Sequence, residues 1–179
     1  MNLDVVAGSG NDEFYTPHYA ILPLIKYLPP NSSIWCPFDS DKSLIVKNLA
    51  DSGHFVINTH LDEGEDFFQF SEPLDCDLII SNPPYSKKTE VLEKLFGWGK
   101  PFGMLLGLVG LFESKKRFEM FRNNEFEVMY FDKRISYYRS YEDEKPALNP
   151  PFSSVWLCHK VLPKPVLFEV VDKKRGSNK

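Results

Sequence analysis

The stretch Asp77-Leu-Ile-Ile-Ser-Asn-Pro-Pro-Tyr85 joins a short apolar run to a proline-rich turn. The run 77–81 is bounded by polar residues and has the β-branched content of a buried strand. Apolar side chains recur at helical spacing after the turn, which predicts a helix over 86–98. A buried strand that leads directly into a helix is half of a strand–helix–strand unit, so this stretch predicts an α/β fold.

The same alternation continues on both sides of this stretch. Further strands are predicted over 33–38, 54–59, 102–109, 126–131, 153–159 and 165–171, and further helices over 113–123 and between the capping residues Asp39, Ser40 and Asp41 and a stop at Gly53. Strands 54–59 and 77–81 are both expected to be buried on two faces. The alternation requires right-handed crossovers, which predicts a mostly parallel sheet covered on both faces, with an antiparallel edge among the last strands.

Length and composition indicate a single domain over 1–172, followed by a basic flexible tail over 173–179. The three cysteines are odd in number and widely spaced, which is typical of free buried thiols in a reducing compartment and predicts a cytoplasmic protein. The chain lacks a leader pattern and an apolar run of about 20 residues, so we expect it neither to be exported nor to span a membrane. Its histidines lack metal-ligand spacing, so no metal is expected.

The formal net charge of −4 is divided unevenly along the chain. Residues 1–80 hold 3 Lys/Arg against 13 Asp/Glu, a balance of −10, whereas residues 81–179 hold 18 against 12, a balance of +6. The basic residues gather in two groups, namely Lys115, Lys116, Arg117 and Arg122, and Lys133, Arg134 and Arg139. Such an excess can contact phosphates, which makes DNA the expected partner, although scattered solvated side chains fit the pattern equally well.

The segment 134–141 mixes two arginines with three tyrosines between two predicted late strands. This mixture suits contact with phosphates and stacking on an extruded base, and a solvated hairpin loop is the alternative interpretation. From Phe112 onward the chain has room to complete the sheet but not for an added recognition domain. Any choice of target sequence would therefore come from loops or from a protein partner. Nothing in the sequence indicates an oligomeric state.

The turn Asn82-Pro83-Pro84-Tyr85 has the residue types needed to activate a planar amino group. Such a group is a poor nucleophile because its lone pair is delocalised into the ring or carbonyl beside it. An asparagine oxygen and the carbonyl of Pro83 can each accept one N–H and offset the positive charge that grows on nitrogen. The prolines make the turn rigid, and Tyr85 offers a flat face for stacking. The alternative is an ordinary Asn-Pro turn.

The chain contains a second string of this kind, Asn149-Pro150-Pro151-Phe152. It follows the charged segment 142–145 instead of an apolar strand. We therefore interpret it as a rigid lead into the predicted strand 153–159, and use it as an internal control for the first string.

With these motifs, the chain resembles the adenine-specific (N6) DNA methyltransferases, in particular small phage and bacterial members that use S-adenosylmethionine. The segment Asn11-Asp-Glu-Phe-Tyr15-Thr16-Pro17 is similar to the family's N-terminal cofactor motif, and Asn82 to Tyr85 to its catalytic motif. The resemblance implies a Rossmann-like fold, methyl transfer to the exocyclic amino group of adenine, and a further set of cofactor-binding residues. That set is Pro37, Phe38 and Asp39 after the first strand, and Asp66 and Phe67, where Asp66 would accept a hydrogen bond from the cofactor's adenine amino group unless it is only part of a solvated acidic turn.

The chain departs from the family in the turn after its first strand. Such turns normally contain a glycine pair, because only glycine readily adopts positive φ and lets the backbone approach a ligand. Here residues 38–43 contain no glycine. Either Asp39 or Asp41 reaches the cofactor amine in a loop of another shape, or the cofactor site is degraded. Two alternatives to DNA methylation therefore stay open, a methyltransferase for a protein glutamine amide and a binding protein that keeps the fold without catalysis.

Overall fold

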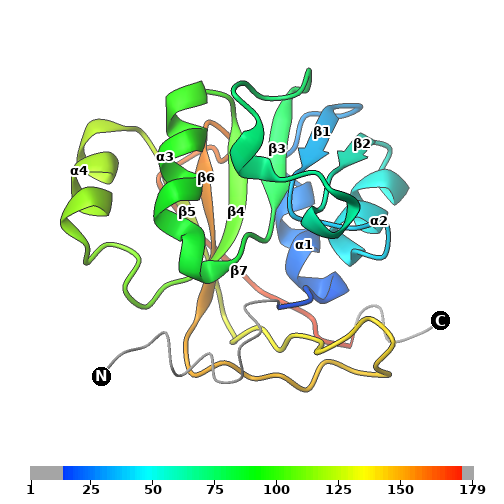
Figure 1. The fold of residues 1–179 in the computed structure, drawn as a ribbon. Coiled ribbons are helices and arrows are strands. Elements are labelled where there is room, and N and C mark those ends of the chain that lie inside the picture. The colour runs from blue at the N-terminus through cyan, green and yellow to red at the C-terminus, as the bar shows by residue number, and fades with distance from the viewer. Residues whose placement is uncertain (1–13, 175–179) are drawn as a thin grey trace.

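Residues 14–174 are described by a computed structural model, in which one seven-stranded sheet has the order β2-β1-β3-β4-β6-β5-β7 (Figure 1). The strands are β1 (Ser33–Cys36), β2 (Phe55–Asn58), β3 (Leu78–Ser81), β4 (Phe102–Gly107), β5 (Glu127–Phe131), β6 (Ser154–His159) and β7 (Val166–Glu169). The helices are α1 (His18–Ile25), α2 (Leu44–Asp51), α3 (Lys88–Trp98) and α4 (Lys115–Asn123), with short 3-10 turns η2 (Leu61–Glu63), η3 (Phe67–Gln69) and η4 (Tyr85–Lys87).

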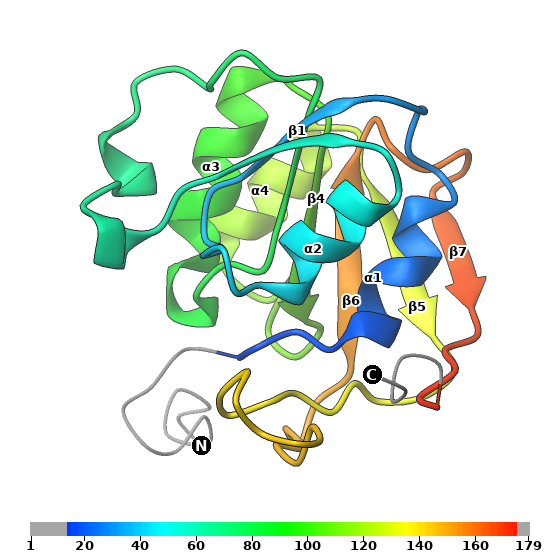
Figure 2. The same ribbon diagram turned by 90° about the vertical axis from the view of Figure 1, so that its right-hand side faces the viewer.

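The sheet is mostly parallel and is covered on both faces, which confirms the Rossmann-like α/β class predicted from the sequence. Only β6 runs antiparallel to its neighbours β4 and β5 among the described strands. It lies in the late half of the sheet, with β5 and β7 outside it. Helices α1 and α2 cover one face, and α3 and α4 cover the other (Figures 1 and 2). The core is accordingly divided into two apolar layers.

The chain leaves β1 and β3 in opposite directions. After β1 it crosses over α2 to the neighbour β2, whereas after β3 it crosses over α3 to β4 on the other side. The connections that follow these two adjacent strands therefore lead apart, which creates a crevice beyond the carboxyl ends of the strands. Open α/β sheets bind ligands in such a crevice. The β1 turn (residues 37–43) and the turn from Asn82 to Tyr85 both begin at this point.

Helix α2 stops before Gly53 as its sequence predicts, but its N-cap is Ser43 and not one of the expected capping residues Asp39, Ser40 and Asp41. Ser43 caps its first turn by accepting a hydrogen bond from the backbone N–H of Ile45, and Gly53 follows its last turn with φ +88°. A side chain is rarely tolerated at that dihedral angle, so glycine is the residue expected there.

The prediction that strand 54–59 is buried on both faces is wrong. β2 is an edge strand, and Phe55 keeps 69% of its surface exposed. Its β-branched and aromatic residues are also compatible with an exposed edge, because β propensity reports a fit to a pleated surface and not burial itself. The prediction holds for β3, whose four residues are all buried.

Helix α1 is not predicted from the sequence. Pro23 lies inside it and removes one backbone donor, a feature that normally argues against a helix. Burial offsets this cost, because Tyr19, Ala20, Ile21 and Leu24 all lie in the core and Ala20 accepts a hydrogen bond from the Trp156 indole at 2.9 Å.

A long connector (residues 132–153) between β5 and β6 runs beneath the carboxyl ends of the strands, beside the N-terminal arm (residues 14–17) (Figures 1 and 2). The two are joined by an antiparallel bridge between Tyr15 and Tyr138, and the connector is itself braced by a bridge between Tyr137 and Leu148. Ser136 of the connector is held by the hydroxyl of Tyr19. The arm and the connector therefore close one side of the crevice together.

The three cysteines are free and buried, as expected from their spacing. Residues 11–13 of the predicted cofactor motif and 175–179 of the predicted tail lie outside the described residues. Within residues 14–174, none of the helices combines the length and the apolar character needed to cross a bilayer.

Candidate active site

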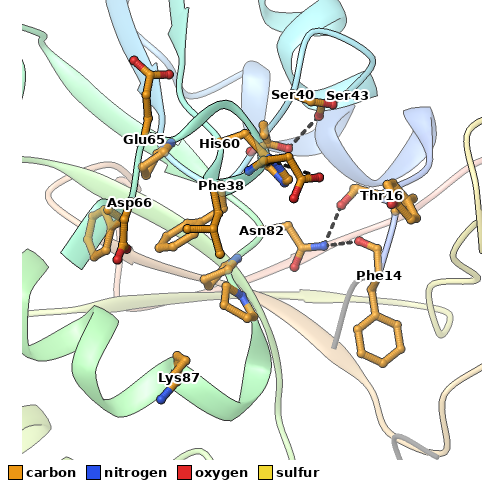
Figure 3. Close-up of a pocket in the computed structure, with 18 of the residues that line it drawn as sticks. Phe14, Thr16, Phe38, Ser40, Ser43, His60, Glu65, Asp66, Asn82 and Lys87 are labelled. Carbon is orange, nitrogen blue, oxygen red and sulfur yellow. Dashed lines mark hydrogen bonds and ion pairs between the residues drawn. The ribbon is translucent and has the colours of Figure 1, made fainter. Parts of the chain in front are cut away.

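A cavity of about 470 Å³ lies at the diverging ends of β1 and β3. This volume is in the range of small-molecule and cofactor sites. The residues that line it come from the arm, the β1 turn, the segment after β2, the turn after β3 and the connector (Figure 3). They are Phe14, Tyr15, Thr16, Pro37, Phe38, Asp39, Ser40, Ser43, His60, Leu61, Asp62, Glu65, Asp66, Phe67, Phe68, Asn82, Pro83, Pro84, Ser86, Lys87 and Tyr141.

The amide of Asn82 is held in one orientation by the arm. Its Nδ2 group donates to the carbonyl oxygen of Phe14 at 2.6 Å and to Oγ1 of Thr16 at 3.0 Å (Figure 3). A carbonyl can only accept, so the amide nitrogen and not its oxygen must face Phe14. The oxygen Oδ1 is left buried without a hydrogen-bond partner. A buried acceptor in this state costs roughly 1–3 kcal/mol, which a ligand that donates an N–H would recover.

The carbonyl of Pro83 is the second acceptor beside Asn82. Within residues 14–174 it receives no hydrogen bond, whereas the carbonyl of Pro84 is taken by the backbone N–H of Lys87 at 3.0 Å. Within the described residues, two acceptors without partners thus occur at adjacent positions of one rigid turn.

Tyr85 lies beside the cavity and does not line it. Its ring stacks on Phe14, with centroids 5.0 Å apart and an interplanar angle of 22°, and its hydroxyl is 2.9 Å from that of Tyr137. Tyr137 is fully buried and also bonds Ser154 at 2.7 Å. The hydrogen bond between the hydroxyls of Tyr85 and Tyr137 therefore fixes the ring plane of Tyr85. One of the two ring faces is covered by Phe14.

The β1 turn is organised by a buried carboxylate in place of glycine. Asp39 accepts hydrogen bonds from the hydroxyls of Ser43, at 2.6 Å, and of Ser81, and Ser81 in turn accepts from the backbone N–H of Phe38 at 3.1 Å. Burial raises the pKa of the Asp39 carboxyl above its ordinary value, against the lowering effect of the two hydroxyl donors. These bonds tie the turn after β1 to the end of β3.

No residue of the β1 turn has positive φ; the non-glycine residues that do, within 14–174, are Asn31 and Lys160. The absence of glycine thus causes no backbone strain in this turn. Asp39 lines the cavity, but both its oxygens are engaged by serines, and Asp41 is exposed and accepts from Asn58 at 3.0 Å.

An aromatic wall forms the side of the cavity opposite the arm. The ring of Phe38 contacts that of Phe67 with centroids 4.7 Å apart, and Phe67 is buried against Trp35 and Trp98. Asp66 is half-buried beside this wall and caps η3 by accepting from the N–H of Phe68 at 2.9 Å through Oδ1. Asp66 therefore has an ordered capping role, and within the described residues its other carboxylate oxygen accepts no hydrogen bond.

The predicted arm residues are only partly brought to the cavity. Tyr15 and Thr16 line it, and Thr16 acts on Asn82 through its hydroxyl. Pro17 is buried at the start of α1 and lies outside the cavity lining. The structure thus gives Thr16 a positioning contact that the sequence motif did not reveal.

Sequence reasoning missed several lining residues. Tyr141 reaches the cavity from the connector, where its hydroxyl lies 3.5 Å from the carbonyl of Thr16. Burial, followed by the nearby Asp39 carboxylate, raises the pKa of Tyr141. Asp62 and Glu65 also line the cavity, and among residues 14–174 Lys87 is the one Lys or Arg in the lining. The aromatic content of 134–141 singles out the tyrosines of this segment for stacking on a base, but does not indicate that Tyr141 lines the cavity.

The predicted basic groups are used largely within the protein. Arg117 donates to the carbonyls of Leu111 and Gly110 and to Thr89, at 2.6–2.8 Å, so it braces the start of α4. Lys116 pairs with Glu93 at 2.7 Å. Arg134 and Arg139 are exposed on the connector, but Tyr137 between them is fully buried. The segment 134–141 is therefore neither a fully solvated loop nor a fully exposed surface for stacking on a base.

The second string, Asn149 to Phe152, forms no comparable site. Asn149 is exposed and accepts from the Ser136 hydroxyl at 2.6 Å, and the segment leads into β6 as predicted.

No protein-family model matches the chain, and no curated protein matches it in sequence. Among solved structures, TrmN from Thermus thermophilus is similar with 13% identity and a TM-score of 0.43, over 87% of this chain and 52% of that one. A protein from Vibrio vulnificus YJ016, described as a modification subunit of a type I restriction enzyme, is similar with 11% identity and a TM-score of 0.49, over 96% of this chain and 50% of that one. The chain spans about half the length of each, and likeness at this level concerns the fold alone.

Proposed function

We propose that this chain is an S-adenosylmethionine-dependent methyltransferase that acts on the exocyclic amino group of adenine in DNA. The observation that carries the proposal is the fixed amide of Asn82. Its donors are consumed by Phe14 and Thr16, while its oxygen is buried without a partner at the cavity. An acceptor held in this way is suited to a ligand that presents a hydrogen-bond donor such as an N–H, and not to one that presents only acceptors.

The two acceptors of the turn can act together on an amino group. Oδ1 of Asn82 accepts one N–H and the carbonyl of Pro83 accepts the other, which draws electron density onto the nitrogen. As the nitrogen becomes tetrahedral, its positive charge grows, and both dipoles stabilise it without having to reorient. The proton released afterwards passes to water, so no general base is required.

The cavity fits a cationic organic cofactor. Phe38 and Phe67 supply an aromatic wall for a flat ring, and the free oxygen of Asp66 can accept from an amino group on that ring. Among the described residues, the lining holds four carboxylates, those of Asp39, Asp62, Glu65 and Asp66, against the one cation of Lys87. This balance favours a sulfonium or ammonium ligand and disfavours a cofactor that carries several phosphates. When bound, S-adenosylmethionine supplies an electrophilic methyl group.

The β1 turn weakens the alternative of a degenerate binding protein. The main support for that alternative is the lack of glycine, yet the turn needs no positive φ and is ordered by the bonds of Asp39 to Ser43 and Ser81. A site that had lost its function would not be expected to retain a buried carboxylate that accepts two hydrogen bonds beside an open cavity.

Two features support adenine in DNA over a glutamine amide as substrate. Of the positive excess in the second half of the chain, Arg134 and Arg139 stay exposed on the connector, and Lys87, which lines the cavity, is exposed too. A cation next to the amino-binding turn suits the phosphate beside a target nucleotide. In a duplex the base would have to be flipped out of the stack before its amino group could meet Asn82.

The test uses the full chain in two steps. Calorimetric titration of S-adenosylmethionine should show saturable binding that Phe38→Ala weakens about ten-fold, as expected for loss of a stacked ring. Transfer of labelled methyl to single-stranded and duplex oligonucleotides should then be abolished by Asn82→Ala and unaffected by the matched control Asn149→Ala. If the protein binds S-adenosylmethionine and transfers methyl to a glutamine-containing protein but not to DNA, the substrate is a glutamine amide and not adenine. If it binds no S-adenosylmethionine at millimolar concentration, the proposal of a methyltransferase is refuted.

A further inference from the structure

Strand β7 ends the sheet with an open edge. It pairs with β5 on one side, and within residues 14–174 no strand pairs with its other side (Figure 2). The carbonyls of Pro165 and Glu169 accept from β5 and Asp132, and the N–H of Val171 donates to the Asp132 side chain. The backbone groups of the odd-numbered residues 165–171 thus point toward β5. By the alternation of a strand, the backbone groups of Val166, Phe168 and Val170 point outward.

The same three residues form an exposed apolar strip. Val166, Phe168 and Val170 are 46%, 79% and 73% exposed, whereas the neighbouring Leu167 and Val171 are buried. Phe168 also stacks on the half-buried Tyr130 of β5, with centroids 5.4 Å apart. An open strand edge next to an apolar strip is a template for another strand, and proteins that remain monomeric usually blunt it.

The prolines beside β7 do not blunt this edge. Pro163 and Pro165 are both odd-numbered, so the backbone donors that they lack would have faced β5. The outward donors from residue 164 onward remain in place. The two ends of the strip carry opposite charges, Lys164 before it and Asp172 after it, and both residues are exposed. Neither forms an ion pair within the described residues.

We propose that β7 pairs antiparallel with β7 of a second copy of this chain, about a two-fold axis at Phe168. In this register the outward backbone groups of Phe168 face those of the second Phe168, and Val166 faces Val170. The rings of Tyr130 and Phe168 from both copies form one row. Lys164 of each copy lies opposite Asp172 of the other, so the charges at both ends of the strip are complementary.

Neighbouring registers lack this complementarity. A shift that centres the axis on residue 167 places Lys164 opposite Val170, and one that centres it on residue 169 places Lys164 opposite Lys174 and Val166 opposite Asp172. Each of these pairs a charge with an apolar side chain or with a like charge. The register at Phe168 alone matches apolar with apolar and acid with base.

The dimer leaves both cavities accessible, because β7 lies at the opposite end of the sheet from β2 and β1. One strand from each copy forms a small interface, so association is expected to be reversible, with a dissociation constant on the order of 10 µM. The proposal does not depend on the enzymatic activity.

Sedimentation velocity of the full chain across the micromolar range tests the proposal. The chain should pass from monomer to dimer, and Phe168→Ser should raise the dissociation constant at least about ten-fold. Phe55→Ser is the matched control, because Phe55 is a 69% exposed phenylalanine on the opposite edge strand. It should leave the dimer unchanged.

A charge exchange tests the register. Lys164→Asp alone should weaken the dimer, because it sets two acids opposite each other, and the double variant Lys164→Asp with Asp172→Lys should restore it. A chain that stays monomeric throughout, a dimer indifferent to Phe168→Ser, or a double variant as weak as the single one would each overturn the proposal. Circular dichroism of every variant confirms that the fold is retained.

Discussion

The hydroxyl of Thr16 provides the sharpest test of how the candidate site is assembled. Thr16 is 1% exposed, and its Oγ1 accepts from Nδ2 of Asn82 at 3.0 Å. Thr16→Val keeps the shape of the side chain and removes this acceptor. Thr16→Ser keeps the acceptor and removes a methyl group. The two variants therefore separate the hydrogen bond from the packing.

Both variants should lose a similar amount of stability, for different reasons. Leaving one amide N–H of Asn82 without a partner costs about 1–2 kcal/mol, and removing a buried methyl group costs about 1 kcal/mol. For 179 residues, an unfolding entropy of about 2.1 cal/mol/K per residue amounts to about 0.4 kcal/mol per degree. The melting temperature should thus fall by about 3–5 °C for Thr16→Val and about 2–3 °C for Thr16→Ser.

The two variants should differ in catalysis. In Thr16→Val the Asn82 amide keeps only its bond to Phe14 and can swing, so kcat/KM for methyl transfer should fall about ten-fold, equivalent to about 1.4 kcal/mol. Thr16→Ser should retain kcat/KM within about two-fold. Because the hydroxyl acts on Asn82, the dissociation constant for S-adenosylmethionine should stay unchanged in both.

Differential scanning calorimetry, cofactor titration and initial rates on an oligonucleotide give the three readouts. If Thr16→Val weakens cofactor binding and leaves the rate at saturating cofactor intact, the hydroxyl binds cofactor, as the sequence motif implies, and the positioning role is wrong. If Thr16→Ser loses as much activity as Thr16→Val, packing and not the hydrogen bond decides the rate.

Three further predictions concern other residues. The pKa of Asp39 is raised in the folded state, so between its ordinary and raised values the native protein binds more protons than the unfolded chain. Stability should therefore fall as pH rises through that window. Asp39→Asn should flatten this fall, measured as denaturation midpoints from pH 4 to 7. Arg117→Met leaves the carbonyls of Leu111 and Gly110 without donors and should cost about 1–2 kcal/mol in chemical denaturation. Lys87→Glu should lower affinity for oligonucleotides several-fold in fluorescence anisotropy at low salt, and this loss should shrink as salt is added.

Much of the fold follows from local pattern. The apolar runs that become β1 and β3 and the turn between β3 and α3 can be recognised without the structure, because burial of a central parallel strand demands such residues on both faces. Helix α1 escapes this reasoning, since Pro23 suggests a break and the compensating burial arises only when the sheet is present. The exposure of β2 escapes it too, because position in the sheet is not encoded in the strand itself.

The site divides in the same way. Asn82 and Pro83 can be identified from their own chemistry and from their place after a strand. What orients Asn82 cannot, because Phe14 and Thr16 are 68 and 66 positions away in the chain. Arg117 shows the opposite error, since a basic cluster in sequence is read as surface charge although three of its bonds are internal.

The closure of the cavity by the arm and the connector has a consequence for the order of folding. The contact between Thr16 and Tyr141 spans 125 positions, and the bridge between Tyr15 and Tyr138 lies beside it. Loops of this length are closed late, after the local strand and helix pairs have formed. During synthesis, α1, β1 and β3 are complete well before the connector leaves the ribosome. The nascent chain therefore carries Asn82 for a time without its closing wall, and the ligand site is completed only when the connector joins the arm.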